Sequence, residues 1–381
     1  MNDGSKNEAR SSMRKRGVVH RILINISEYG IVHMRKMTEG KAGSFYNFLS
    51  DGCKLCQLGS KMVLFITGKC ERSCFYCPVS AERKRDVVYA NERHVRSDED
   101  VINEVRQMSA LGTGITGGEP LMERERVLHY IRLLKSEFGP GHHIHLYTSI
   151  APQKDVLAAL AEAGLDEIRF HPPLELWNSL VDTPFADSIR NAIKLDISVG
   201  IEVPAIKGAE KIADFINSFG GFLNLNELEF SDTNAAAMRK RGFELHDDMS
   251  NAVLNSRLCA QKIAPSCAKV HFCSSRYKDA VQLKNRLLRT AENTSRIFDE
   301  VTEEGTIAYG VIKNSDLRTS LEILYKMEVP DDMFEVKNGR IEIAWWILED
   351  IADLLKEAGS ILIIIERYPF EGGLVVQTIP V

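Results

Sequence analysis

The chain has 381 residues, of which 44% are hydrophobic and 27% charged, and this composition excludes an intrinsically disordered or fibrous protein. Its formal net charge of −5 disfavours a strongly basic nucleic-acid-binding protein. No apolar run approaches the length of a membrane span, and the N-terminus lacks the apolar core of a secretory signal, so we expect a cytoplasmic protein without membrane contact.

Residues 1–60 are predicted to form an N-terminal extension. The first 16 residues are polar and basic without an apolar period, which indicates a mobile leader. The end of the extension carries the pair Cys53-Lys-Leu-Cys56, just before the first predicted strand.

Residues 61–235 alternate between short apolar runs of strand length and amphipathic segments with a helical period. This alternation predicts a parallel sheet with right-handed crossovers, in which sites gather at the carboxyl ends of the strands. Six strand–helix units predict an open or partial barrel. The expected strands are 62–67, 114–117, 144–148, 167–170, 199–203 and 225–230, and the expected helices are 98–111, 121–138, 154–163, 185–195 and 211–219.

The pattern changes after a cysteine-bearing post-barrel segment, 236–297. Residues 298–381 are predicted to form a small α+β domain in which Asn338-Gly339 turns a hairpin. The predicted fold class is therefore α/β, a partial barrel followed by the post-barrel segment and the α+β domain. In the last domain we expect strands at 306–312, 361–366 and 374–379, a hairpin at 334–344, and helices at 316–327 and 347–358.

The motif Cys70-Glu-Arg-Ser-Cys74-Phe-Tyr-Cys77 follows the first predicted strand. Three thiolates at this spacing on one loop can ligate three irons of a cubane cluster and leave the fourth iron open to another ligand. A zinc site prefers four ligands in paired CxxC form. The motif therefore predicts an iron–sulfur cluster with one open iron.

A second motif, Thr116-Gly117-Gly118-Glu119-Pro120, ends the second predicted strand. The two glycines allow close approach of the backbone to a neighbour. The carboxylate that follows them can accept hydrogen bonds from an ammonium group.

These two motifs, in this order within an α/β pattern, resemble the radical S-adenosylmethionine (SAM) superfamily over about residues 61–235. The resemblance implies a partial (β/α)6 barrel. It also implies an enzyme that reductively cleaves SAM to a 5′-deoxyadenosyl radical, which abstracts hydrogen from a substrate. The electron would come from a donor such as ferredoxin or flavodoxin.

The resemblance also implies roles for individual residues. Cys70, Cys74 and Cys77 would hold a [4Fe–4S] cluster, whose open iron would chelate the amino and carboxylate groups of SAM. Tyr76 would pack near the adenine. The methionyl ammonium would be engaged by Gly117, Gly118 and Glu119. Four residues near the expected mouth of the barrel are further candidate SAM contacts, with an ordinary surface or salt-bridged role as the alternative: Ser149, Arg169, His171 and Glu202.

Five further cysteines border the predicted barrel. Many members of the superfamily carry an auxiliary iron–sulfur cluster, and we expect a second [4Fe–4S] cluster on Cys53, Cys56, Cys267 and Cys273, with Cys259 left over. Zinc or mononuclear iron in the same thiolate cage is an alternative, because thiolates alone do not distinguish these metals. Buried apolar cysteines without a metal are the other alternative.

The substrate is less well defined by the sequence. The appended C-terminal domain favours a large substrate, either RNA or a polypeptide. Segments 53–89 and 267–279 resemble an archaeal branch related to pyruvate formate-lyase activating enzymes, so an activase that makes a glycyl radical on a partner enzyme is an alternative. A non-catalytic iron–sulfur or zinc protein is the third hypothesis, against which the intact Cys70, Cys74, Cys77 and Glu119 argue.

Three groups of basic residues bear on the choice between RNA and polypeptide. They could contact the phosphates of an RNA substrate, or they could simply form solvated surface. The groups are Arg83-Lys84-Arg85, Arg239-Lys240-Arg241, and Lys284 with Arg286 and Arg289.

Overall fold

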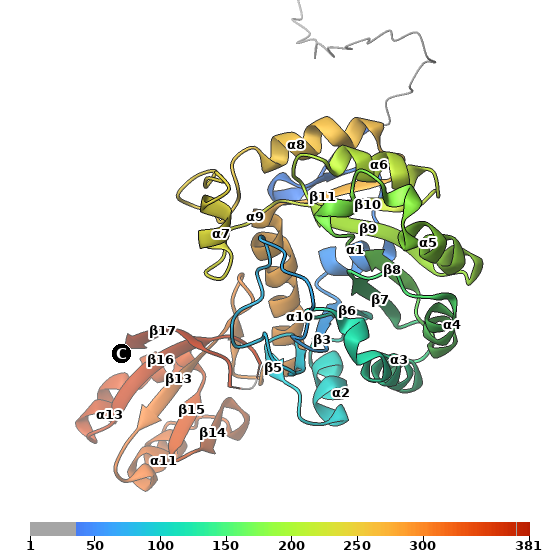
Figure 1. Ribbon diagram of the computed structural model, residues 1–381. Helices are drawn as coiled ribbons and strands as arrows, with labels where there is room; N and C mark the ends of the chain where they lie inside the picture. Colours follow the sequence, from blue (N-terminus) through green and yellow to red (C-terminus); the bar gives the residue numbers. More distant parts are fainter. Residues whose placement is uncertain (1–35, 371) are drawn as a thin grey trace, which may run out of the picture. The chain divides into compact units, whose positions relative to one another are not determined.

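The computed structural model describes residues 36–370 and 372–381 (Figure 1). The predicted leader, residues 1–16, lies outside the described residues. Two sheets make up the described part of the chain, an 11-stranded sheet and a 6-stranded sheet. Within these residues no helix is both long and apolar enough to span a membrane.

The large sheet is built around parallel strands, and it contains all six that the sequence predicts. Each strand pairs in parallel with the next one along the chain, which confirms the α/β class and the right order of the units. The six strands are β3 (Lys61–Phe65), β6 (Gly112–Thr116), β7 (His143–Thr148), β8 (Glu167–Phe170), β9 (Ser198–Pro204) and β10 (Phe222–Asn226).

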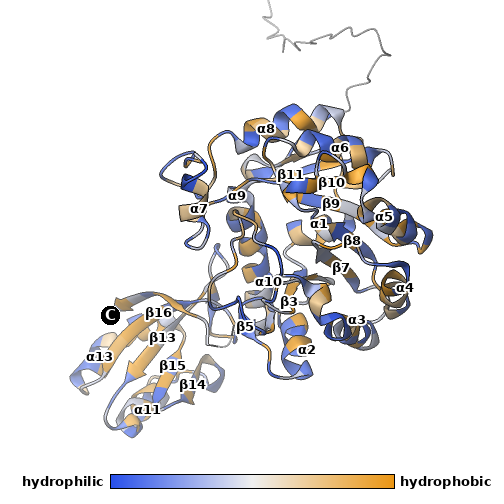
Figure 2. Cartoon of the chain, in the orientation of Figure 1, coloured by the Kyte–Doolittle hydropathy of each residue, from blue (hydrophilic) through white to orange (hydrophobic). Residues whose placement is uncertain are grey.

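Helices between these strands bury one apolar face against the sheet (Figure 2). Ser97 and Asp100 form a capping box that starts the first of them, and Gly164 takes a left-handed conformation (φ 105°) where the third one ends. The helices are α2 (Asp98–Gln107), α3 (Arg124–Phe138), α4 (Lys154–Ala163), α5 (Pro184–Lys194) and α6 (Ala209–Asn217).

A seventh parallel strand, β11 (Val270–Cys273), pairs with β10 and extends the sheet beyond residue 235, where the sequence analysis ends the barrel. All four of its residues are buried. The sequence Val-His-Phe-Cys is too short and too polar to be recognised as a buried strand. The sequence pattern therefore predicts only a post-barrel segment here. β10 also begins three residues earlier than expected, at Phe222.

Short antiparallel strands lie at both edges of the large sheet. On one side β2 (Phe45–Tyr46) pairs with β11 and with β1 (Thr38–Glu39), and on the other β4 (Tyr89–Ala90) pairs with β3 and with β5 (Arg93–His94). The N-terminal extension is therefore part of the barrel sheet.

Helix α1 (Asp51–Gln57) of the extension packs on strands β3, β6 and β7. A Cβ on Gly52 would lie 2.6 Å from Arg169 Nη2 and 2.7 Å from His145 Nδ1, so the helix backbone touches side chains of the barrel interior. This contact brings the CxxC pair of α1 to the inside of the barrel.

The segment after β10 adds helices to the barrel: α7 (Ala235–Arg239), α8 (Ser256–Ile263), α9 (Ser275–Tyr277) and α10 (Lys284–Thr294), with a π-helical stretch at Lys278–Leu283. Two of its basic residues are engaged within the chain. Arg286 Nη2 lies 2.6 Å from Glu92 Oε1, and Arg289 Nη2 donates to the backbone oxygen of Ser109 at 2.5 Å. These contacts hold α10 against the barrel. The guanidinium groups of Arg286 and Arg289 are therefore not free to contact RNA phosphates.

The C-terminal residues form the second sheet, with strand order β14-β15-β13-β16-β17. Asn338 and Gly339 turn the predicted hairpin, both with positive φ. The helix expected at 347–358 is two helices, because the backbone leaves the helical conformation at Ile351 (φ −111°). The elements are β12 (Glu300–Val301), β13 (Ile307–Lys313), α11 (Leu317–Lys326), β14 (Phe334–Lys337), β15 (Arg340–Ile343), α12 (Trp345–Asp350), α13 (Ala352–Glu357), β16 (Ile361–Arg367) and β17 (Val375–Pro380).

Candidate functional site

The loop that carries Cys70, Cys74 and Cys77 follows β3 at the carboxyl end of the strands. Cys70 is exposed and the other two are half-buried. Burial raises the pKa of the Cys70 and Cys74 thiols, and the negative charge of Cys77 raises both further. Three thiols close enough to repel one another as thiolates need a cationic partner to ionise together.

The donor set of this loop fits a polynuclear centre. Three thiolates on one loop are the protein ligands that a [4Fe–4S] cluster with one open iron takes. A structural zinc ion would take a fourth protein ligand. The donor set therefore fits the [4Fe–4S] cluster that the resemblance implies.

The Gly-Gly-Glu turn after β6 packs directly on the cysteine loop. Gly118 N donates to Thr67 O at 2.7 Å, and Glu119 N donates to Lys69 O at 2.8 Å. A Cβ on Gly118 would lie 2.4 Å from Lys69 O and 2.9 Å from Cys70 Cβ. Glycine is therefore required where the two loops meet, since any side chain would push the cysteine loop away.

Glu119 and Ser149, both predicted to contact SAM, are hydrogen-bonded to each other. Glu119 Oε2 accepts from Ser149 N at 2.6 Å and from Ser149 Oγ at 2.7 Å, and Oε1 accepts from Thr148 Oγ1 at 2.7 Å. The side chain is 2% exposed. This carboxylate joins the carboxyl ends of β6 and β7 directly beside the cysteine loop.

Tyr76 and His171, both predicted cofactor contacts, are hydrogen-bonded to each other. Tyr76 Oη lies 2.9 Å from His171 Nε2, and His171 Nδ1 lies 2.7 Å from the backbone oxygen of Glu202. Because a carbonyl oxygen only accepts, Nδ1 carries the proton and Nε2 accepts from the tyrosine hydroxyl. Burial lowers the pKa of His171 and raises that of Tyr76, so both groups are neutral at pH 7.

Arg169 and Glu202, predicted at the barrel mouth, instead pair with each other inside the barrel. Arg169 Nη1 lies 2.8 Å from Glu202 Oε2, and its other donors bond Glu167, Tyr147 and Ser50. Burial would raise the pKa of Glu202, but the charge of Arg169 and hydrogen bonds from two asparagines lower it to about 2. Both side chains are fully engaged by the protein.

The second cysteine group is only partly assembled as predicted. Cys53 and Cys56 lie one turn apart on α1, and their charges raise the pKa of the buried Cys273 thiol further, after burial itself, to about 12. Cys267 is elsewhere: it belongs to the hydrophobic core, and its Sγ donates to Ile263 O at 3.4 Å. Cys53, Cys56 and Cys273 therefore lie near enough for their charges to interact, whereas Cys267 packs in the hydrophobic core.

Sequence reasoning missed His271, which stands two residues before Cys273 on the same face of β11. Its Nδ1 is buried without a hydrogen-bond partner in the structure, and the ring lies near enough to Cys53 to lower the pKa of that thiol. Burial would raise the pKa of Cys53, but Arg169 and His271 outweigh it and lower that pKa to about 7. The spacing His-x-Cys in a strand could have indicated this residue.

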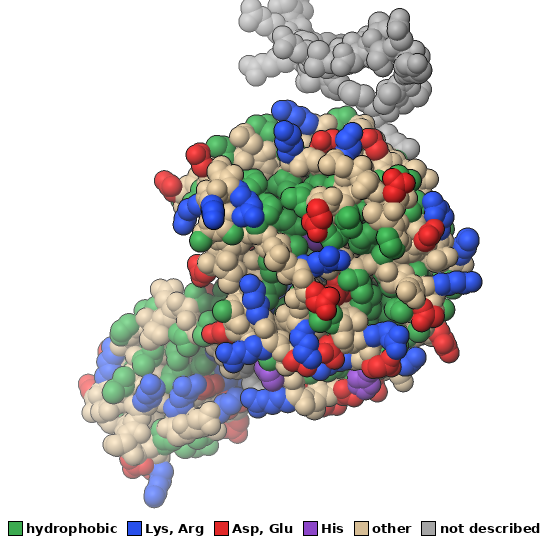
Figure 3. Space-filling model, viewed as in Figure 1, with side chains coloured by type: hydrophobic (Ala, Val, Ile, Leu, Met, Phe, Trp, Pro, Cys, Tyr) green, Lys and Arg blue, Asp and Glu red, His purple; other side chains and the backbone are tan. Residues whose placement is uncertain are grey.

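An apolar groove opens beside the cysteine loop, with a volume of about 960 Å³. Phe75, between Cys74 and Tyr76, reaches into its lining and stacks on Phe243 with ring centroids 5.6 Å apart. Figure 3 shows hydrophobic side chains gathered in the middle of this face, with charged side chains around them. The main apolar residues of the groove are Phe75, Ile206, Phe243, Val253, Leu258 and Ile263.

The groove is tied to the cysteine loop by hydrogen bonds from the segment after β10. Asn234 Nδ2 donates to Tyr76 O at 3.1 Å, and Thr233 Oγ1 donates to Cys77 O at 3.4 Å. Cys259, the cysteine left over in the sequence analysis, is half-buried on α8 and lines the groove.

Comparisons with known proteins agree with this geometry. Residues 64–179 match the family model of the radical SAM superfamily, and residues 305–381 match a domain of unknown function, DUF8061. A protein of Methanocaldococcus jannaschii, named "Putative glycyl-radical enzyme activating enzyme", is 38% identical over 355 residues, which is 88% of this chain and 93% of that protein. The crystal structure of methylornithine synthase matches 57% of this chain and 71% of its own, with 13% identity and a TM-score of 0.38.

Proposed function

Because the chain belongs to the radical SAM superfamily and is a radical SAM enzyme, we propose that it abstracts hydrogen from a polypeptide that docks in the apolar groove. Membership of the family implies a [4Fe–4S] cluster and SAM as cofactors. The relative named as an activating enzyme makes the backbone of a partner protein, at a glycine, the favoured target.

The groove is the observation that supports a polypeptide. It is lined mainly by apolar and aromatic side chains, and one of them, Phe75, comes from the cysteine loop itself. RNA recognition would need free cationic side chains along the path of the phosphates. Arg286 and Arg289 are held in contacts within the chain, and the Arg241 guanidinium lies 4.7 Å from the Phe75 ring centre.

The residues of the site have distinct parts in the proposed reaction. Cys70, Cys74 and Cys77 hold the cluster, which together with SAM supplies the hydrogen-abstracting radical. Glu119, joined to Ser149, accepts the methionyl ammonium. The glycines of the turn keep the backbone against the cysteine loop.

Tyr76 and His171 act as a hydrogen-bonded pair beside the cysteine loop. Their hydrogen bond holds the aromatic ring in place for the adenine, and His171 is in turn held by the backbone of β9. The aromatic pair of Phe75 and Phe243 excludes water from the groove side, which protects a reactive radical.

We also propose that Cys53, Cys56 and Cys273, with His271 in place of Cys267, hold a second metal centre. An iron–sulfur cluster suits three thiolates and an imidazole, and zinc is the alternative. A cytoplasmic location and an electron donor of the ferredoxin or flavodoxin type complete the proposal.

Deuterium transfer tests the substrate class. Protein and RNA fractions from host cells grown in deuterated medium are each mixed with the reduced, reconstituted enzyme and unlabelled SAM under anaerobic conditions. We expect deuterium in 5′-deoxyadenosine from the protein fraction, resistant to ribonuclease and abolished by protease. Deuterium that comes from the RNA fraction alone, or from neither fraction, would contradict the proposal.

A further inference from the structure

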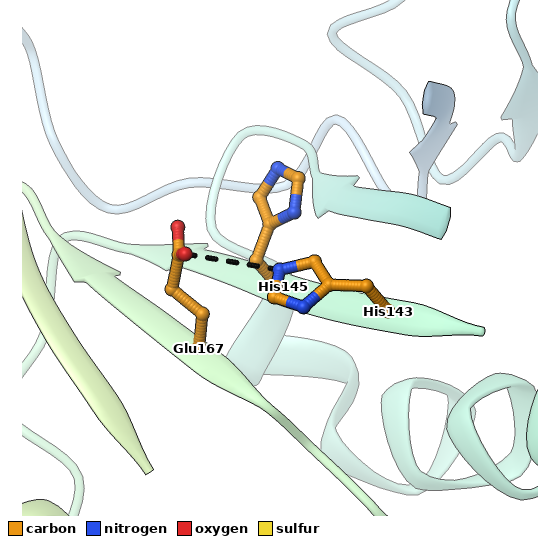
Figure 4. A group of neighbouring side chains, drawn as sticks. All are labelled: His143, His145 and Glu167. Carbon is orange, nitrogen blue, oxygen red and sulfur yellow. Dashed lines mark ion pairs between the residues drawn. The ribbon is translucent and has the colours of Figure 1, made fainter. Parts of the chain in front are cut away.

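Three side chains converge where strands β7 and β8 begin, away from the cysteine loop at the strand ends (Figure 4). His143 and His145 stand two residues apart on β7 and project to the same side of the sheet. The register pairs His145 with Glu167, the first residue of β8. One ligand atom of each of the three lies within 4.8 Å of the others.

Three ring nitrogens of this cluster lack hydrogen-bond partners. Both ring nitrogens of His145 are buried and unpartnered in the structure, and so is His143 Nε2. His145 is 0% exposed. Leaving both nitrogens of a buried imidazole without a hydrogen bond is costly, so this arrangement calls for a bound group.

Glu167 presents one oxygen to the cluster and uses the other elsewhere. Its Oε1 accepts from Arg169 Nε at 2.5 Å and from Ser50 Oγ at 3.2 Å. Its Oε2 has only a long contact from Gly52 N at 3.5 Å and lies 3.7 Å from His143 Nε2, too far for a hydrogen bond. Glu167 Oε2, which has only this long contact, therefore lies close to the unpartnered ring nitrogens.

Gly114 of β6 and Gly52 of α1 make room for the His145 ring itself. A Cβ on Gly114 would lie 2.7 Å from Nε2, and a Cβ on Gly52 would lie 2.7 Å from Nδ1.

We propose that His143, His145 and Glu167 bind a divalent transition metal of the zinc class, with nitrogen and oxygen ligands only. Bonds of about 2.0–2.2 Å would bring the three ligand atoms about 3.4 Å apart, which small rotations of these side chains can achieve. The positive charge of Arg169 is offset by Glu167 and Glu202, because its guanidinium is paired with both carboxylates.

The position of this centre gives it a structural role. Glu167 is bonded to Ser50, the N-cap residue of α1, and to the backbone of Gly52. A metal here fastens the helix that carries Cys53 and Cys56 to β7 and β8. It lies where the strands begin, whereas substrates of such barrels bind where the strands end.

Zinc binding to the full chain tests the proposal. The protein is first reconstituted with iron and sulfide, so that the thiols are occupied, and is freed of other metal before titration with zinc chloride. X-ray absorption at the zinc edge then reports the ligands. We expect one zinc per chain with a nitrogen and oxygen shell, and a zinc-dependent rise in Tm.

The variant His145→Asn is expected to weaken zinc binding about 100-fold or more, because it removes one of three protein ligands. His142→Asn is the matched control. His142 is also buried and directly precedes β7, but its Nε2 is hydrogen-bonded to Thr113 Oγ1 at 2.9 Å. The control should bind zinc like the wild type. No zinc uptake by the wild type, a zinc shell containing sulfur, or equal binding by His145→Asn would each overturn the proposal, and the first two need no variant.

Discussion

Cys53 lies near enough to Cys273 for its charge to raise the pKa of the Cys273 thiol, whereas Cys267 packs among core side chains. The sequence predicted all three as ligands, because nothing in the spacing of residues 259–273 shows which cysteines point inward. Strand β11 determines which side chains point into the barrel, because its residues alternate between the barrel interior and the helices outside. His271 and Cys273 point inward together.

Iron content distinguishes these cysteines. Cys53→Ala and Cys273→Ala should each lower the iron of the reconstituted protein by about half, from about eight to about four per chain. Cys267→Ala is the matched control and should keep the wild-type content, because its sulfur bonds only Ile263 O. Iron lost from the Cys267 variant, or full iron retained by Cys53→Ala and Cys273→Ala, would contradict this assignment.

Glu119 and Ser149 show what sequence can establish at this scale. Both follow neighbouring parallel strands, so their meeting was predictable from the strand order alone. Arg169 and Glu202 also lie near strand ends, but they pair with each other in the interior. Which charged groups neutralise one another across strands depends on register, and that is not visible in a single chain's sequence.

At the scale of elements, the close contact between the cysteine loop and the Gly-Gly-Glu turn needs a glycine at position 118. Gly118→Ala should displace the cysteine loop, because the new Cβ would meet the backbone oxygens of Gly68 and Lys69. We expect loss of most cluster iron and at least a tenfold fall in SAM cleavage. Gly141→Ala, whose Cβ would meet nothing within 4 Å, should leave both unchanged. A Gly118→Ala protein with normal iron and activity would show that the loops do not depend on this contact.

The C-terminal sheet contains a buried carboxylate, Glu342, that we expect to contribute to acid stability. Glu342 is 3% exposed; burial would raise its pKa, but hydrogen bonds from Arg296 and Arg340 lower it below the ordinary value of 4.5. A carboxyl with a lowered pKa stabilises the fold above pH 4.5, and this stabilisation is lost as the pH falls further.

Glu342→Gln should therefore destabilise the protein by about 2–3 kcal/mol at pH 7, because the charged hydrogen bonds from Arg296 and Arg340 are weakened. The loss is no larger, because Arg296 keeps Asp299 and Glu335 as partners. The difference in Tm between wild type and variant should shrink as the pH falls from 6 to 3. Hydrogen exchange of β13 to β15 would localise the effect. A difference in Tm that stays constant over this pH range would refute the assigned pKa shift.

Most of the elements were predictable, because their apolar periods are clear. The strand at 167–170 and the helix at 154–163 have the bounds that the sequence predicts. Strand β11 was not predicted, because four residues with a histidine and a cysteine have no period long enough to recognise. The break at Ile351 has no proline or glycine to mark it, so the last helix was predicted as one.

At the scale of the molecule, the groove links the cysteine loop to the helices that follow the barrel. Leu258 of α8 is 53% exposed within it. Leu258→Asp should lower substrate-dependent formation of 5′-deoxyadenosine about tenfold, because a carboxylate in an apolar contact disfavours docking of a polypeptide. Slow cleavage of SAM without substrate should continue at the wild-type rate.

Leu111→Asp is the matched control for this variant. Leu111 is 54% exposed but does not line the groove, so its substitution should affect neither rate. Equal effects of the two substitutions, or a full rate in Leu258→Asp, would show that the substrate enters elsewhere.

The central claim is that Cys70, Cys74 and Cys77 hold the cluster that cleaves SAM. It is tested most directly by 5′-deoxyadenosine formation with dithionite and SAM, measured anaerobically for the reconstituted wild type and for Cys74→Ala. The account predicts 5′-deoxyadenosine from the wild type and none above background from the variant. Equal formation by both proteins would contradict it.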